Sequence, residues 1–144
     1  MSDQRFATAE AAEAEFYRAF ETADQNAMMA VWADDDNIAC VHPGGPLLLG
    51  RRAVMDGWRQ VLAEPGRMSF RVEPQSQSSS GELAVHILHE HITLTGELHA
   101  RTPVVVTNIY RQTPSGWRMV LHQASPNLRG GGAEREPAAR ATVH

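Results

Sequence analysis

The residues best suited to chemistry are a histidine and an asparagine that the sequence places in apolar strands. His42 follows the apolar residues 38–41 and is itself followed by the Pro-Gly-Gly-Pro turn at 43–46. An imidazole with an ordinary pKa of about 6.5 can accept a proton near neutral pH. Asn108 stands in the apolar run 104–110, where its amide could donate to a developing oxyanion. The sequence therefore suggests a pocket with His42 as general base and Asn108 as oxyanion donor.

Two other interpretations of these residues stay open. In the structural one, His42 satisfies a backbone carbonyl of the following turn and Asn108 holds a neighbouring strand or loop in place. In the metal interpretation, His42 joins His89 and His91, two residues apart on one strand face, in a zinc site. The spacing of these histidines is weak evidence, so we expect no metal and no other cofactor.

Composition bounds the class of protein. The chain has 144 residues, which suits one domain, and 13 basic against 17 acidic residues give a net charge of −4. The arginines are scattered instead of forming the basic face that nucleic acid requires. Cys40 is the single cysteine, so we expect no internal disulfide and a buried free thiol. No apolar run is long enough for a bilayer, and we expect a cytoplasmic protein without membrane contact.

Hydrophobic periodicity predicts three helices followed by a sheet. Apolar residues recur at helical spacing over residues 8–23, 27–33 and 51–63. Thr8 is expected to cap the first helix, and Pro65-Gly66 to stop the third. The period then changes to two, which predicts strands at 68–73, 82–95, 98–112 and 117–125, with a polar connection at 75–81. A short strand at 38–41 precedes them. We expect one α+β domain over residues 1–127 and a polar, mobile tail at 128–144.

Registering the hairpins predicts which side chains share the inner face of the sheet. A two-residue turn at Gly96-Glu97 would place His89 opposite Val104, and the next turn would place Asn108 opposite Leu121. The inner face would then carry an apolar lining with a few polar groups, which is typical of a small-molecule pocket. The predicted lining is Phe16, His42, Trp58, His89, Asn108, Tyr110, Leu121 and Gln123. The opposite face would carry Leu88 and His122 among mostly apolar residues, and because it is too apolar to be left in water we expect a second copy of the chain to cover it.

The order of elements and several short motifs resemble the nuclear transport factor 2-like superfamily. The motifs are Phe16-Tyr17, Trp32-Ala33-Asp34, His42-Pro43-Gly44-Gly45 and Gly50-Arg51, and the closing Gly116-Trp117-Arg118 with 122–126 resembles its SnoaL-like branch. The resemblance covers roughly residues 8–127. It implies a cone-shaped curved antiparallel sheet behind three N-terminal helices. It does not imply one chemistry, because the fold carries isomerases, cyclases, dehydratases and assembly domains.

The steroid Δ-isomerases of this fold give the most informative comparison. Their general-base aspartate, followed by proline, matches His42 here, and their oxyanion aspartic acid matches Asn108. Their oxyanion tyrosine is replaced by Phe16, and a supporting tyrosine by Trp58. The resemblance therefore implies that steroid isomerisation is not the activity of this chain.

Three functions remain as hypotheses from the sequence. The first is a small-molecule-binding domain of unassigned activity with a mostly apolar pocket. The second is an isomerase, dehydratase or cyclase of a small apolar carbonyl compound, with His42 as base. The third is a homo-oligomeric association module without catalysis, which a filled pocket with internally bonded polar groups would favour. In each case we expect a homodimer through the outer face of the sheet.

Overall fold

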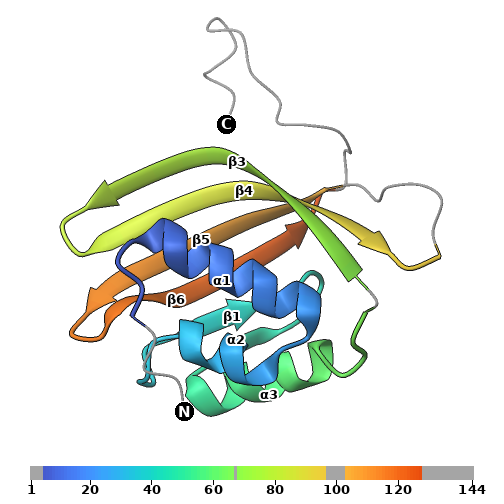
Figure 1. Cartoon of the computed structure of the whole chain (residues 1–144), viewed down its shortest axis with the longest axis horizontal. Coiled ribbons are helices and arrows are strands. Elements are labelled where there is room, and N and C mark those ends of the chain that lie inside the picture. Colours follow the sequence, from blue (N-terminus) through green and yellow to red (C-terminus); the bar gives the residue numbers. More distant parts are fainter. Residues whose placement is uncertain (1–4, 67, 97–102, 128–144) are drawn as a thin grey trace, which may run out of the picture.

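Three helices cover one face of a curved, open six-stranded sheet (Figure 1). The computed structural model describes residues 5–66, 68–96 and 103–127, so the predicted Gly96-Glu97 turn lies partly, and the tail at 128–144 wholly, outside the described residues. The strand order is β2-β1-β6-β5-β4-β3. The predicted α+β class is confirmed. Within the described ranges, none of the helices is both long and apolar enough to cross a membrane.

Polar caps fix the first two helices. Helix α1 (Ala9–Thr22) begins at Thr8, whose side-chain oxygen accepts from the Ala11 N–H at 3.0 Å. Helix α2 (Gln25–Val31) begins at Asp24, whose carboxylate accepts from the Ala27 N–H at 3.0 Å. The predicted cap at Thr8 is confirmed. Asp24, which the sequence placed in a break between helices, is the cap of α2, because a short side-chain oxygen can satisfy a free N–H there.

An arginine joins the third helix to the second. Helix α3 (Arg51–Val61) starts after Gly50. The guanidinium of Arg51 donates to the carbonyls of Met29 at 3.0 Å and Ala33 at 2.8 Å. Carbonyls at and just beyond the end of a helix lack helical partners, so one side chain satisfies two groups there and fixes α3 against α2.

The strands β3 to β6 form the predicted antiparallel meander, and one parallel pair, which was not predicted, makes the sheet mixed. Strand β1 (Ala39–Val41) pairs antiparallel with β2 (Leu47–Leu49) and parallel with β6 (Gly116–Pro126). Strands β4 (Leu83–Leu94) and β5 (Val104–Thr113) run antiparallel to their neighbours. Two parallel strands need a long connection between them. The helix α3 and the strands that follow it provide this connection between β1 and β6.

Strand β3 is longer than predicted. It runs over Met68–Ser80 with a register shift between Pro74 and Ser76, so it includes the polar segment that the sequence assigned to a connection. This segment is exposed on both faces and lies at the edge of the sheet. Backbone pairing with β4 alone holds it extended, and hydrophobic alternation cannot reveal such a strand.

Two register differences change the predicted faces. In the structure His89 pairs with Val105 instead of Val104. A bulge beside Tyr110 pairs Asn108 with His122 instead of Leu121, although Tyr110 does pair with Met119 as predicted. Because side chains alternate along a strand, each one-residue shift moves side chains to the opposite face. Several predicted faces were therefore wrong. Val85, Ile87, His89, His91, Leu121 and Gln123, predicted on the inner face, lie on the outer face, whereas Leu88 and His122, predicted on the outer face, lie on the inner face.

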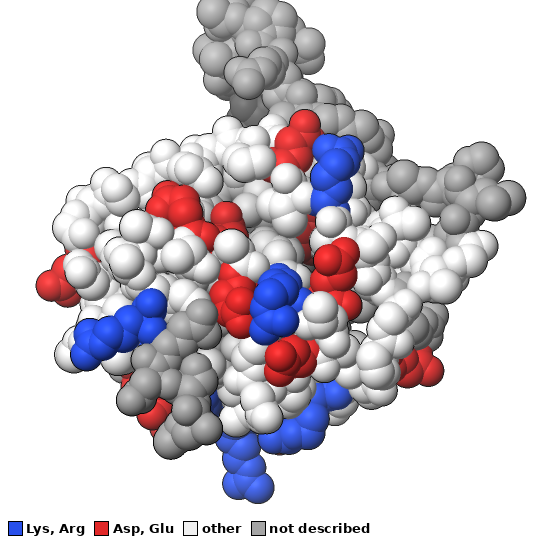
Figure 2. Space-filling model, viewed as in Figure 1, with Lys and Arg blue, Asp and Glu red and all other residues white. Residues whose placement is uncertain are grey.

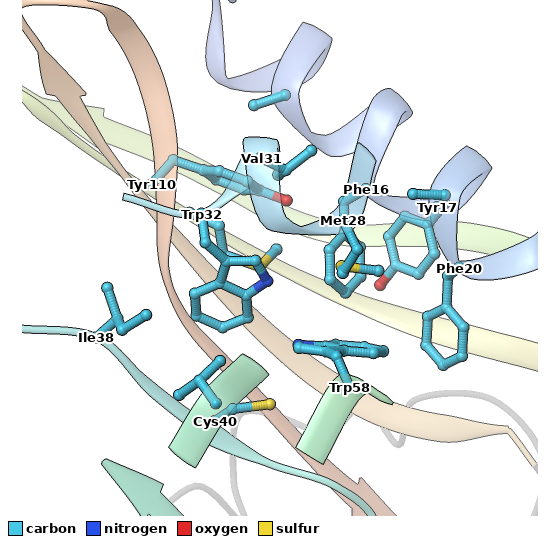
Figure 3. Close-up of a cluster of buried hydrophobic side chains, with 14 of the residues drawn as sticks. Phe16, Tyr17, Phe20, Met28, Val31, Trp32, Ile38, Cys40, Trp58 and Tyr110 are labelled. Atoms are coloured by element: carbon cyan, nitrogen blue, oxygen red, sulfur yellow. The ribbon is translucent and has the colours of Figure 1, made fainter. Parts of the chain in front are cut away.

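Aromatic side chains fill the space between the helices and the sheet (Figure 3). Phe16 is fully buried, and its ring centroid lies 5.4 Å from that of Trp58 and 4.9 Å from that of His122. Phe20 packs edge-on against Trp58 at 4.9 Å. The aromatic residues predicted to line a pocket are thus packed on one another in the core.

Gly116 gives a test of the packing between the N-terminal segment and β6. Its φ is +104°, and a Cβ there would lie 2.8 Å from the backbone nitrogen of Phe6. We expect Gly116→Ala to lower the free energy of unfolding by at least about 2 kcal/mol, because backbone atoms cannot move aside cheaply. Gly81→Ala is the matched control: its φ is +60° and the site is open, so a loss of about 1 kcal/mol is expected. Equal losses in urea denaturation would contradict the close contact.

Candidate functional site

Five polar side chains meet in the interior between α1 and the inner face of the sheet. Tyr17 donates its hydroxyl proton to Glu90 Oε2 at 2.6 Å. Glu13 Oε2 accepts from the Tyr110 hydroxyl at 2.8 Å and from Asn108 Nδ2 at 3.2 Å. Asn108 Nδ2 also donates to the Tyr17 hydroxyl at 3.2 Å. We call this group, with His122, the buried network. It links two carboxyl groups through neutral donors, which is how a protein interior accommodates such groups.

His122 extends the network toward the aromatic core. Its Nδ1 lies 2.7 Å from Asn108 Oδ1. Because Asn108 uses its NH₂ group on Glu13 and Tyr17, its oxygen is the acceptor and His122 Nδ1 carries the proton. Complete burial and the nearby His42 lower the pKa of His122 to about 3. His122 is therefore a neutral imidazole, held in one tautomer.

Burial changes the acidity of the other groups as well. It raises the pKa of Glu90 to about 7, although the hydrogen bond from Tyr17 acts in the opposite direction. Burial, followed by the charge of Glu90, raises the pKa of Tyr17 well above its ordinary value. The same two causes raise the pKa of the Cys40 thiol to about 12. Glu90 is thus a carboxyl group that can exchange a proton near neutral pH, whereas Cys40 is a protonated, unreactive thiol.

His42 lies beside the network at an opening between α3 and β2. Its ring stands edge-on to Trp58 at 4.7 Å, its Nε2 lies 3.6 Å from Cys40 Sγ, and its centroid is 6.3 Å from that of His122. Burial lowers the pKa of His42. The opening has a volume of about 500 Å³ and is lined by His42, Pro46, Leu48, Ala53, Asp56, Gly57, Gln60 and Val61. A neutral imidazole at its wall is available as a base.

A second opening lies at the other end of the network. It is formed by the N-terminal turn of α1, the β3–β4 hairpin and Trp117, and its volume is about 370 Å³. His86 is buried beneath it, with Nδ1 3.1 Å from Glu13 Oε2 and Nε2 3.6 Å from Glu10 Oε2. We call this opening the α1–β3 pocket. His86 and Glu13 therefore connect it to the buried network.

Sequence comparison identifies the family. The profile of the SnoaL-like domain matches residues 9–129. The chain belongs to the SnoaL-like domain family. A protein of Arabidopsis thaliana, F-box protein SKIP8, is 23% identical over 114 residues, which are 79% of this chain. The match covers 47% of that relative, so the SnoaL-like chain spans about half of its length.

Solved structures place this SnoaL-like domain in the nuclear transport factor 2-like superfamily. A Thiobacillus denitrificans protein, assigned as a calcium/calmodulin-dependent protein kinase type II association domain, is 43% identical with a TM-score of 0.82. The match covers 85% of this chain and 98% of that one. A Streptomyces avermitilis protein of the NTF2-like family, assigned as a dehydratase, is 31% identical with a TM-score of 0.71, over 80% and 90% of the two chains.

The SnoaL-like fold brings together only part of the predicted site. Phe16, Trp58, Asn108 and Tyr110 are fully buried around the network, and His42 lies beside it. His122 stands between His42 and Asn108, and every polar atom of the Asn108 side chain is bonded internally. The outer position of His89 and His91 separates them from His42, so the three are not gathered for zinc. In the described ranges, no other three metal-ligating side chains are gathered either.

Sequence reasoning missed the two buried carboxyl groups and both inner histidines. Glu13 stands four residues before Tyr17 on α1, a spacing that places both on one helix face. This spacing could have been recognised beside the apolar residues of that face. Glu90 and His86 share the strand parity of Leu88, so the register error that misplaced Leu88 hid them too. Only the correct strand register could have shown that Glu90 and His86 face inward, because both residue types are usually exposed to solvent.

The raised pKa of Glu90 predicts a pH-dependent effect of its substitution. Between pH 4.5 and about 7 the unfolded chain releases the Glu90 proton and the folded chain keeps it, so this residue makes folding less favourable as pH rises. Relative to the wild type, Glu90→Gln should therefore gain roughly 3 kcal/mol of unfolding free energy across this window. Urea denaturation at a series of pH values measures the difference. The pKa of His122 is lowered, so His122 makes folding more favourable as pH rises and partly hides the effect of Glu90 in the wild type. The test is therefore the difference in unfolding free energy between Glu90→Gln and the wild type at each pH.

Tyr17→Phe provides the comparison variant. It removes the hydrogen bond that lowers the pKa of Glu90. The pH range over which Glu90 loses its proton only on unfolding should therefore extend to higher pH. A Glu90→Gln difference that is the same at every pH would refute the assignment.

Proposed function

We propose that this SnoaL-like domain is a self-association module that pairs with a second copy through the outer face of its sheet. One observation carries the proposal. The four most exposed large apolar side chains among the described residues all belong to that face. They are Leu47, Leu49, Leu83 and Ile87, with 60%, 65%, 46% and 37% of their surface exposed. Apolar residues gathered on one face at this exposure are typical of a protein interface.

The strand register joins these residues into continuous rows. One row runs across five strands through Leu49, Ala39, Leu121, Ile109 and Val85. The next runs through Leu47, Val41, Gln123, Thr107 and Ile87. Five strands span roughly 20 Å, which is the scale of an interface of about 800 Å² per partner. The three helices lie on the opposite side (Figure 1), so nothing in the described chain covers these rows.

Two further observations favour association over ligand binding in the interior. The inner face is filled by packed aromatic rings, and the polar groups of Asn108 bond within the protein. The 43% identical relative is assigned as an association domain. The helix-covered face in Figure 2 shows acidic and basic side chains interspersed, as expected of a surface that stays in water.

Charge substitution on the outer face tests the association. Ile87→Glu and Leu49→Glu place a carboxylate in the two rows, and each should convert a dimer into a monomer because an unpaired charge is costly to bury. The matched control is Ala14→Glu on the exposed side of α1, which should leave the dimer intact. Sedimentation velocity at about 10 µM protein distinguishes dimer from monomer, since a dimer whose dissociation constant is below this concentration is mostly assembled. A monomeric wild type would contradict the proposal.

A second candidate function is acid–base chemistry on a small apolar carbonyl compound. His42 lies in the wall of an opening of about 500 Å³, where an imidazole can act as a general base, and the 31% identical relative is assigned as a dehydratase. In this proposal His42 is the base, Asn108 donates to the oxyanion, and Phe16, Trp58 and Tyr110 contact the ligand. Asn108 would have to exchange an internal partner for the substrate. His89, Leu121 and Gln123 have no part in it, because they face outward.

Hydrogen exchange of a ketone tests the second candidate. Cyclopentanone in D₂O should incorporate deuterium faster with the wild type than with buffer alone. His42→Gln should slow this exchange by roughly a hundredfold, since a positioned base contributes about that much. His91→Gln removes an imidazole from the outer face and is the control, expected to keep the wild-type rate. No acceleration by the wild type, or equal rates for His42→Gln and the control, would refute His42 as base.

A further inference from the structure

The α1–β3 pocket has a different lining from the other surfaces described above. The register pairs Gln77 with His86 and Ser79 with Ala84, which places all four on the inner face at the tip of the β3–β4 hairpin. Thr8, Ala9 and Glu10 form the opposite wall and Trp117 closes one side. An aromatic ring, hydroxyl and amide groups and a carboxylate thus surround a space of about 370 Å³, enough for a small organic molecule.

His86 is the unusual group in this pocket. The residue is 1% exposed, yet its Nδ1 makes no hydrogen bond. That atom lies 3.1 Å from Glu13 Oε2 but outside hydrogen-bonding geometry, and Nε2 is 3.6 Å from Glu10 Oε2. Buried polar groups normally have a partner. The other ring nitrogen, Nε2, faces Glu10 and the pocket, and it carries the lone pair in the tautomer that has its proton on Nδ1.

The charge around this pocket is unbalanced. In the described part of the chain, His86 is the residue that lies within ion-pair distance of Glu10 and Glu13. The arginines nearby in sequence or fold are engaged elsewhere: Arg18 pairs with Glu15 and Asp24, and Arg111 with Asp35. The sequence contains no lysine. Glu10 therefore lines the pocket beside His86, Glu13 lies beneath it, and none of the described lining residues is an arginine.

We propose that the α1–β3 pocket binds a small organic cation, with a guanidinium or ammonium group between Glu10 and His86. The cation would donate to the Glu10 carboxylate and to His86 Nε2, and its alkyl part would lie along Ala84 and Trp117. A positive group can donate to both acceptors at once, and a planar guanidinium suits a carboxylate especially well. The site lies on the other side of the sheet from the association surface and away from His42, so the inference goes beyond both functions proposed above.

An anion is the opposite possibility, because a helix N-terminus favours negative charge. Two contacts oppose it here. Thr8 already accepts from the Ala11 N–H, which removes one free donor from the helix end. Glu10 places its own carboxylate in the first turn and in the pocket wall, so an anion would meet like charge.

The test compares two probes of the same shape. n-Butylguanidinium carries the positive charge, and n-butylurea is its neutral counterpart. In an amide NMR titration of the full chain, we expect saturable shifts at the residues lining the pocket with n-butylguanidinium at concentrations up to about 10 mM, the affinity range of a single charged contact. n-Butylurea should cause no saturable shift. Equal responses to both probes, or no saturable response to n-butylguanidinium, would overturn the proposal.

Two variants locate the contact. Glu10→Gln removes the charge from an exposed side chain without disturbing the core and should weaken binding about tenfold, because one charge-assisted hydrogen bond is lost. Glu64→Gln removes a charge near the far end of α3 and should bind as the wild type does. Unchanged binding by Glu10→Gln, or an equal loss in Glu64→Gln, would show that the cation responds only to the overall charge and would overturn the site. The Ile87→Glu variant should keep the wild-type affinity, since its side chain lies on the outer face of the sheet.

Discussion

The burial of two carboxyl groups under α1 constrains the whole interior of this SnoaL-like domain. An ionised carboxylate away from water costs several kcal/mol unless hydrogen bonds replace its hydration. Glu90, whose pKa burial raises to about 7, accepts a hydrogen bond from the Tyr17 hydroxyl, while Glu13 accepts from Tyr110 and Asn108. These donors come from α1 and β5, and the acceptors from α1 and β4. The distances between them therefore fix the helix against two strands, and the aromatic rings pack around that arrangement.

The two faces of the sheet carry different kinds of side chain. The inner face carries the buried network and the helices, whereas the outer face carries the apolar rows that we assign to a second copy. This division depends on the register of β4 with β5 and on the bulge beside Tyr110. In the arrangement that we propose, association would use the outer face and leave the inner face free to differ among relatives. One relative of this fold is assigned as an association domain and another as a dehydratase, and a fold does not determine its function.

The two openings lie at opposite ends of one chain of polar contacts. His86 and Glu13 connect the α1–β3 pocket to Asn108, and Asn108 leads to His122, whose ring is 6.3 Å from that of His42. A ligand that changed the contacts of Glu13 would therefore act on groups that also hold His122 and Tyr110. Tightly packed interiors transmit such changes because their side chains have few alternative positions. The α1–β3 pocket and the opening beside His42 are thus joined by a continuous chain of side-chain contacts.

The sequence alone determined the class of fold, the three helices and the cap at Thr8, because these follow from periodicity, from capping chemistry and from the family resemblance. It also placed Asn108 and Tyr110 on the inner face of the sheet, although it predicted a pocket there and the structure shows a packed core. Only the tertiary structure decided the roles of Asp24 and Arg51, the parallel β1–β6 pair and the edge strand at 75–80, because each depends on a partner distant in sequence. It also decided which histidines face inward. A side chain's face depends on strand parity, and one bulge, which leaves no hydrophobic signal, moved His122 into the core and Leu121 and Gln123 out of it.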